Sequence, residues 1–137
     1  MKRRKAREYA LQILFQIDFT KKKIDSFDFT QFWYGKRNSQ DIKQFTEELV
    51  QGTLDNLEEI DTMLDSVTDN WMLGRMAAVD RAILRFAAYE LLYRRDIPSA
   101  VTINEAIEIA KKYSSSEAVS FLNGVLDRFA HEVKKGQ

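Results

Sequence analysis

The residues best suited to chemistry are five cations that precede the first acid of the chain, Glu8: Lys2, Arg3, Arg4, Lys5 and Arg7. Arginine pairs with phosphate through two parallel hydrogen bonds and stacks on bases, and arginine-rich segments commonly become ordered on RNA. Cations at a helix N-terminus oppose the helix dipole, so they have no evident structural purpose there. The cluster favours a polyanion ligand over the alternative, a solvated basic terminus with no ligand.

The rest of the chain is acidic. The whole sequence contains 21 Lys and Arg residues against 21 Asp and Glu residues, for a formal net charge of zero. Because the basic cluster uses several of those cations, the remaining residues have a net negative charge. A basic segment joined to an acidic body again indicates a polyanion partner for that segment.

Catalytic and metal-binding patterns are missing from the sequence. There is no cysteine, and the only histidine is His131, which excludes thiolate sites, histidine-rich zinc sites and di-iron bundles with two Glu-x-x-His motifs. No Walker A loop, GxGxxG loop or nucleophile elbow occurs. The paired carboxylates Glu58, Asp61 and Asp65 lie on a segment so acidic that solubility explains them. We therefore expect a protein that is not an enzyme and holds no metal or cofactor.

No targeting or membrane segment is evident. No apolar run approaches the roughly 18 residues of a membrane span. Polar residues such as Glu8, Gln12 and Gln16 interrupt the N-terminal segment where a signal peptide would be apolar. We expect a soluble cytoplasmic protein without membrane contact.

The elements that must position these residues are helical. A length of 137 residues, a single proline (Pro98) and long stretches of 3.6-residue periodicity predict one all-α domain over residues 1–137. Residues 77–93 have only four charged positions and predict a helix buried at the centre of a bundle. We expect a first helix over about residues 5–19. A short aromatic segment over residues 24–38 follows, and then a long helix from about residue 39 with a kink at Gly52.

Local patterns make these predictions more specific. We expect the acidic residues of the long helix to form a solvated face. Residues 71–75 predict a short helical turn. Thr102 with Glu105, and Ser114 with Glu117, match the capping-box pattern and predict the starts of the last two helices. One buried stripe is expected on the first helix: Ala6, Tyr9, Ala10, Ile13, Leu14 and Ile17.

Three stretches carry a resemblance to a known family: RRKAREYALQILFQIDF, then Trp71, Leu73 and Arg75 as W-x-L-x-R, then VDRAILRFAAYELLYRRDIPSAVTINEAIEIAKKYSSSEAVSFLNGVLDR. With them the chain resembles the NusB family of bacterial antitermination factors, whereas residues from about 20 to 65 are too variable to contribute. The resemblance implies a compact bundle of about seven helices in two packed subdomains, about 1–68 and 69–137. It also implies a role without catalysis. Such a factor binds boxA RNA with ribosomal protein NusE and joins the RNA polymerase antitermination complex, chiefly on ribosomal RNA operons.

The same resemblance assigns site residues by position. The RNA-binding set is Lys2, Arg3, Arg4, Lys5 and Arg7 at the N-terminus, with Phe121 stacking on a base and Trp71 and Arg75 extending the surface. Taken without the resemblance, Phe121 indicates core packing. The NusE-binding set is Phe15 and Asp80, with Leu11 completing an apolar strip on the outer side of the first helix. The family often has tyrosine at the position of Phe15, so this chain lacks that hydroxyl.

Two other functions stay open at this point. A similar module occurs fused to a ribosomal RNA cytosine methyltransferase, so the chain could target RNA for such an enzyme. It could also be a protein-only homodimeric adaptor whose acidic body covers its basic segment. The sequence does not decide between a monomer and a homodimer.

Overall fold

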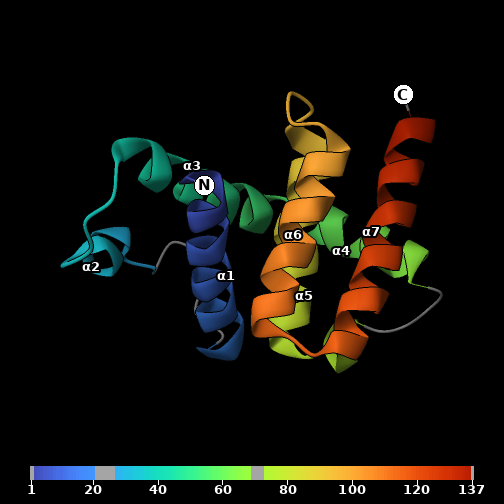
Figure 1. Ribbon diagram of the computed structural model, residues 1–137, viewed down its shortest axis with the longest axis horizontal. Helices are drawn as coiled ribbons and strands as arrows, with labels where there is room; N and C mark the ends of the chain where they lie inside the picture. The colour runs from blue at the N-terminus through green and yellow to red at the C-terminus, as the bar shows by residue number, and fades with distance from the viewer. Residues whose placement is uncertain (1, 21–26, 69–72, 137) are drawn as a thin grey trace.

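The computed structural model describes residues 2–20, 27–68 and 73–136, which form helices and connecting turns with no strand in these ranges (Figure 1). The elements are α1 Lys2–Thr20, α2 Phe29–Trp33, α3 Gln40–Asp55, α4 Leu57–Val67, the 3-10 turn η2 Leu73–Arg75, α5 Ala78–Tyr93, α6 Ser99–Tyr113 and α7 Ser116–Lys135. The predicted all-α bundle of about seven helices is confirmed. The division into two subdomains stays a prediction, and most of the buried apolar side chains of both halves belong to one cluster.

Helix α5 is the centre of the bundle. It packs against α1, α3, α4, α6 and α7, and Figure 1 shows α6 in front of it with α1 and α7 on either side. Ile83, Leu84, Phe86, Ala87 and Ala88 are fully buried. The apolar character of this segment therefore predicted its place correctly, since a helix without a polar face needs neighbours all round.

Helix α1 begins at Lys2, earlier than the predicted start near residue 5. The basic residues are therefore part of a helix and do not form a flexible arm. All six residues of the predicted stripe are buried, where α1 packs against α3, α5 and α6. This packing gives each basic side chain a definite direction.

The aromatic segment contains a short helix, α2. Helix α2 is capped by Asp28, whose side chain accepts a hydrogen bond from the Gln31 amide. The chain turns at Gly35, where a φ of +80° favours glycine. The buried Trp33 packs edge-on against Tyr9 of α1, with ring centroids 5.2 Å apart.

The predicted kink at Gly52 was wrong in position, because the long helix divides into α3 and α4 at Asn56. Both the backbone amide and the side-chain amide of Asn56 donate to the Gly52 carbonyl, at 3.2 and 2.8 Å. Gly52 has a different role, since a Cβ there would lie 2.2 Å from Cε1 of Tyr89. Glycine at this position lets α3 approach α5 closely.

The acidic face of α3 and α4 is only partly solvated, which corrects the sequence prediction. Asp55, Glu58 and Asp65 are exposed. Four other carboxylates accept hydrogen bonds from side chains of α2, α5 or the α5–α6 turn: Glu47 from Trp33, Glu48 from Arg94 and Tyr89, Glu59 from Tyr93, and Asp61 from Arg85.

Both predicted capping boxes were wrong. Helix α6 begins at Ser99, and its N-cap residue is Pro98, whose ring fixes φ and whose missing amide hydrogen leaves no donor unpaired before the helix. Thr102 and Glu105 are instead buried inside the bundle. Helix α7 is capped by Ser115, whose Oγ accepts from the Ala118 amide at 3.1 Å.

Candidate nucleic-acid interface

The first turns of α1 direct the basic side chains toward different neighbours. Helical residues one position apart point about 100° apart around the axis. Arg4 faces α6, while Arg3 and Arg7 face the Phe45 ring of α3. Lys5 is exposed, with its Nζ 5.2 Å from the centroid of the Tyr9 ring. Lys2 begins the helix, and its side chain lies outside the described part of the structure.

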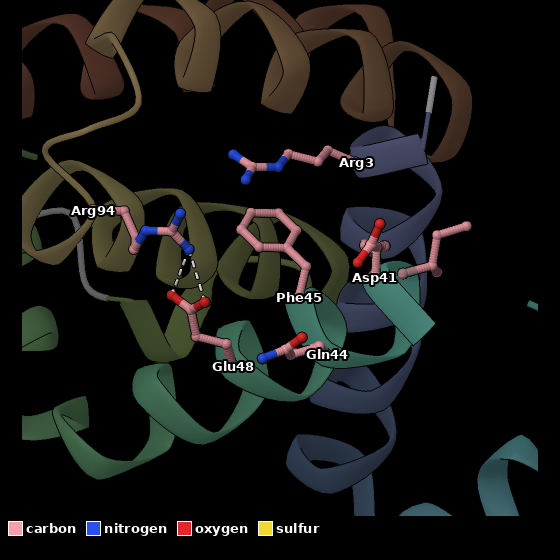
Figure 2. A pocket seen from close by; sticks show the side chains of 8 residues that line it. Arg3, Asp41, Gln44, Phe45, Glu48 and Arg94 are labelled. Carbon is pink, nitrogen blue, oxygen red and sulfur yellow. Dashed lines mark hydrogen bonds and ion pairs between the residues drawn. The ribbon is translucent and has the colours of Figure 1, made fainter. Parts of the chain in front are cut away.

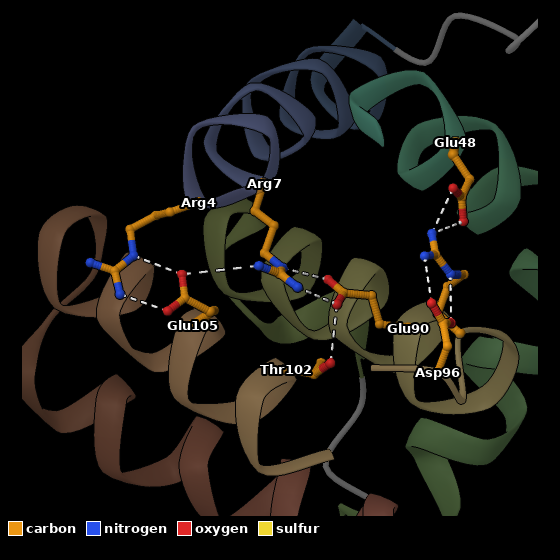
Figure 3. A network of polar contacts seen from close by, with 8 residues as sticks. Arg4, Arg7, Glu48, Glu90, Asp96, Thr102 and Glu105 are labelled. Carbon is orange, nitrogen blue, oxygen red and sulfur yellow. Dashed lines mark hydrogen bonds and ion pairs between the residues drawn. The ribbon is translucent and has the colours of Figure 1, made fainter. Parts of the chain in front are cut away.

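Arg7 is buried and pairs with a carboxylate of the central helix. Its Nε and Nη2 donate to Oε2 and Oε1 of Glu90 at 2.8 and 2.7 Å (Figure 3). Thr102 of α6 donates to the same carboxylate at 3.0 Å. Arg7 is only 2% exposed, so its guanidinium cannot reach a phosphate in this structure. The prediction that Arg7 contacts RNA is therefore corrected: the residue fastens α1 to α5.

Arg4 is paired but remains accessible. Its Nε and Nη2 donate to the two carboxylate oxygens of Glu105 at 2.8 and 2.7 Å (Figure 3). The Arg4 side chain keeps 35% of its exposure, against 6% for Glu105. These hydrogen bonds from Arg4 are the main cause that lowers the pKa of the Glu105 carboxyl below its usual value. Arg4 can thus meet a phosphate at its outer edge while Glu105 holds its inner edge.

Arg3 lies at a pocket of about 300 Å³ beside the N-terminal turn of α1 (Figure 2). Its guanidinium carbon is 4.7 Å from the centroid of the Phe45 ring. Across the pocket, Arg94 donates to Glu48 at 2.7 Å and to Asp96 at 2.9 Å. Hydrogen bonds from Arg94 lower the pKa of Asp96 to about 2. Within the described residues no ion pair or hydrogen bond joins Arg3 to a carboxylate, and Asp96 interacts with it only at longer range, so its hydrogen-bond donors are available to a ligand.

The other predicted RNA contacts lie away from this basic turn. Phe121 is 39% exposed in the second turn of α7, a helix that begins at the end of the bundle opposite to the start of α1 (Figure 1). Arg75 is exposed at the end of η2, close before α5. Trp71 falls outside the described residues. The structure therefore does not bring Phe121 and Arg75 next to the N-terminal cations.

The predicted NusE contacts are only partly on the surface. Leu11 is 4% exposed and belongs to the core, so the expectation that it forms an outer apolar strip is corrected. Phe15, one turn further along α1, is 36% exposed. Asp80 is half-buried at the start of α5 and accepts a hydrogen bond from the Ser114 hydroxyl.

The two arginines of the central helix form ion pairs. Arg81 pairs with Asp18 of α1 and donates to the carbonyls of Leu73 and Met76. Arg85 donates to both carboxylate oxygens of Asp61, at 2.9 and 2.8 Å. These contacts join α5 to its neighbours and give both residues a structural role.

Sequence reasoning missed the acids that hold the basic turn. Glu90 and Glu105 were not singled out as site residues, although Glu90 stands in an otherwise apolar stretch of α5. A buried carboxylate needs a charged or hydrogen-bonding partner, so its isolation there could have predicted a cation from another helix.

Two absences also concern the site. In the part of the chain that the structure describes, no three potential metal-binding side chains come together to form a site. No helix in those same ranges is both long and apolar enough to cross a membrane.

Comparison with known proteins decides the family, because the model of the NusB family matches residues 4–131. The chain belongs to the NusB family. "Transcription antitermination protein NusB" of Thermodesulfovibrio yellowstonii is 49% identical over 142 residues, covering 96% of this chain and 93% of that protein. NusB is a non-enzymatic family of antitermination proteins, in agreement with the function class predicted from the sequence.

Solved structures of NusB proteins share the fold. The structure of T. maritima NusB superposes with a TM-score of 0.82 at 38% identity, covering 95% of this chain and 91% of that one. A crystal structure of the antitermination factors NusB and NusE in complex with dsRNA superposes with a TM-score of 0.85 at 23% identity, covering 96% and 97%. At that identity the second likeness supports the fold alone.

Proposed function

We propose that this NusB-family chain is a transcription antitermination factor that binds boxA RNA together with ribosomal protein NusE. In this role it joins the RNA polymerase antitermination complex in the cytoplasm, chiefly on ribosomal RNA operons. The observation that carries the proposal is the family match over nearly the whole chain, residues 4–131. The solved structure of NusB with NusE and dsRNA has the same fold, and its partners are of the kind that we propose for this chain.

The proposed RNA surface begins at the first turn of α1. Lys2, Arg3, Arg4 and Lys5 supply its charge, and such phosphate contacts position RNA without reading its sequence. Arg75 and Phe121 extend the surface toward the other end of the bundle, where the Phe121 ring can stack on an unpaired base. Trp71, outside the described residues, stays in the proposed set on the family resemblance alone. Arg7 acts from inside, because its ion pair with Glu90 holds the basic turn in place.

We further propose that RNA recognition is shared with NusE. A small set of accessible cations neutralises few phosphates, so the chain alone binds RNA weakly at physiological salt. NusE docks where α1 ends and α5 begins, on Phe15 and Asp80. Asp18 and Arg81 pair across this same end of the bundle, which joins the two helices there.

An RNA titration with and without NusE tests the proposal. We expect weak binding of boxA RNA by the chain alone and tighter binding with NusE. Lys5→Ala should weaken binding and reduce the slope of log affinity against log salt by about 1, as expected for one lost phosphate contact. The matched control is Lys135→Ala, which removes an exposed cation from the last turn of α7, where it pairs with Glu132.

Three outcomes would contradict the proposal: equally tight binding with and without NusE, an unchanged salt slope in Lys5→Ala, or no binding at all. Asp80→Lys should remove NusE from the complex on a sizing column while the helical circular dichroism stays the same. Sedimentation with and without boxA RNA reports in the same samples whether the chain is a monomer or a homodimer.

A further inference from the structure

The pocket beside α1 has walls that suit a flat ligand. It lies between α1, α3 and the turn that joins α5 to α6, and its volume of about 300 Å³ is at the lower end of the range for small-ligand sites. The guanidinium groups of Arg3 and Arg94 lie 4.7 and 5.4 Å from the centroid of the Phe45 ring. Figure 2 shows them reaching toward that ring from different sides. Planar guanidinium groups held in this way can stack on a planar ring.

The charges of the pocket nearly cancel. The charged side chains that line it are Arg3 and Arg94 against Asp41 and Glu48, two of each sign. Arg94 pairs with Glu48 and also with Asp96, which lies outside the lining. A phosphate dianion would gain little from such a balance, whereas a neutral ring with polar edges meets both a donor and an acceptor.

Two side chains can read the edge of such a ring. Asp41 and Gln44 line the pocket on α3 and are exposed. No side-chain hydrogen bond joins either of them to another described residue. A carboxylate only accepts hydrogen bonds, and a glutamine amide both donates and accepts. Asp41 therefore favours a ligand edge that carries an amino group.

We propose that this pocket binds one RNA base that bears an exocyclic amino group, such as cytosine. The base stacks on the outer face of the Arg3 guanidinium, its amino group donates to Asp41, and the Gln44 amide pairs with the neighbouring ring atoms. The inference rests on the proposed function. It changes the role of Arg3 from a phosphate contact to a base contact, while Arg4, on the other side of α1, remains the phosphate contact.

Two single-stranded RNA probes of equal length, oligocytidine and oligouridine, test the pocket. Their backbones are identical, but cytosine carries an amino donor where uracil carries a carbonyl acceptor. In the presence of NusE the wild-type chain should bind oligocytidine at least roughly tenfold more tightly than oligouridine, as expected for one hydrogen bond to a charged group. Gln44→Ala and Arg3→Lys should reduce affinity for oligocytidine. Arg3→Lys should reduce this affinity without changing the slope of log affinity against log salt, because lysine keeps the positive charge but lacks the planar guanidinium group.

The matched control is Gln51→Ala, the same change on the exposed face of α3 outside the pocket. It should keep the preference for cytosine. Equal affinity of the wild-type chain for the two probes would overturn the inference, and so would wild-type affinity of both pocket variants. If the wild-type chain binds neither these probes nor boxA RNA, the proposed function fails and the pocket inference with it.

A competition experiment separates an RNA base from a free nucleotide, which carries the same ring. Cytidine monophosphate is added to the complex with labelled oligocytidine. If cytidine monophosphate displaces the labelled RNA only at concentrations far above those at which unlabelled oligocytidine does, the site binds a base that is part of an RNA strand. Displacement at equal nucleotide concentrations would overturn RNA as the source and point to a mononucleotide site.

Discussion

Arg7 and Glu90, 83 positions apart in the chain, form a buried ion pair through two hydrogen bonds of 2.8 and 2.7 Å (Figure 3). Their side chains are 2% and 0% exposed. The pair joins the basic turn of α1 to the central helix, and Thr102 adds α6 to the same carboxylate. Arg7 therefore fixes the position of the turn that carries the proposed RNA contacts, although Arg7 itself does not reach the surface.

Removing one member of this pair should destabilise the fold strongly. Arg7→Met leaves Glu90 buried without its cation, and breaking such a pair typically costs about 3–5 kcal/mol. The double variant Arg7→Met with Glu90→Leu should recover much of that loss, because it leaves no unpaired charge. Urea unfolding measures both. Arg75→Met, at an exposed arginine, serves as the control and should change the free energy of unfolding by no more than about 0.5 kcal/mol.

The ion pair between Arg4 and Glu105 should make stability depend on acid. Hydrogen bonds from Arg4 lower the pKa of Glu105 in the folded chain, whereas an unfolded glutamate titrates near about 4.3. The pair therefore contributes its full stability above the unfolded pKa and loses it as the pH falls through the lower folded value. Wild type should lose more free energy of unfolding than Glu105→Gln between about pH 6 and about pH 3. If the free energy of unfolding falls with pH in the same way in both proteins, the ion pair between Arg4 and Glu105 does not contribute to stability.

Two glycines in helices should respond in opposite ways to alanine. At Gly52 a Cβ would lie 2.2 Å from the Tyr89 ring, while at Gly124 it would meet nothing within 4 Å. Gly52→Ala should destabilise the fold by about 1–3 kcal/mol, because the packed Tyr89 ring, or α3 and α5 themselves, must shift to make room. Gly124→Ala, on the exposed side of α7, should stabilise it by about 0.5–1 kcal/mol through higher helix propensity. Thermal unfolding of the two variants tests both predictions. A stabilising effect of Gly52→Ala would disprove the close packing of Gly52 against Tyr89.

Two apolar residues one turn apart on α1 should separate folding from partner binding. Leu11 is buried and Phe15 is 36% exposed. Leu11→Ala should cost about 2–5 kcal/mol of stability by leaving a cavity in the core. Phe15→Ala should cost less stability than Leu11→Ala, because Phe15 is more exposed, and should weaken binding of NusE, measured by calorimetry. Unaltered NusE affinity in Phe15→Ala would remove this residue from the proposed docking face.

The properties that the sequence determined by itself are local ones. The buried stripe of α1, from Ala6 to Ile17, and the central place of α5 followed from which positions are apolar, because a helix repeats its faces every 3.6 residues whatever it packs against. The family resemblance also depended on continuous sequence motifs, which need no knowledge of the tertiary structure. The fold class and the family were therefore predictable before any coordinates.

Only the tertiary structure decided the roles of the polar residues. Thr102 and Glu105 have the spacing of a capping box, yet both are used by residues from other helices: Glu90 and Arg4. Arg7 and Arg4 look equivalent in the sequence, but one is buried and the other accessible. The physical reason is that a charge removed from water must find a partner, and that partner can come from any part of the chain. Spacing along the sequence cannot say which, so the pairing is visible only after the helices have packed.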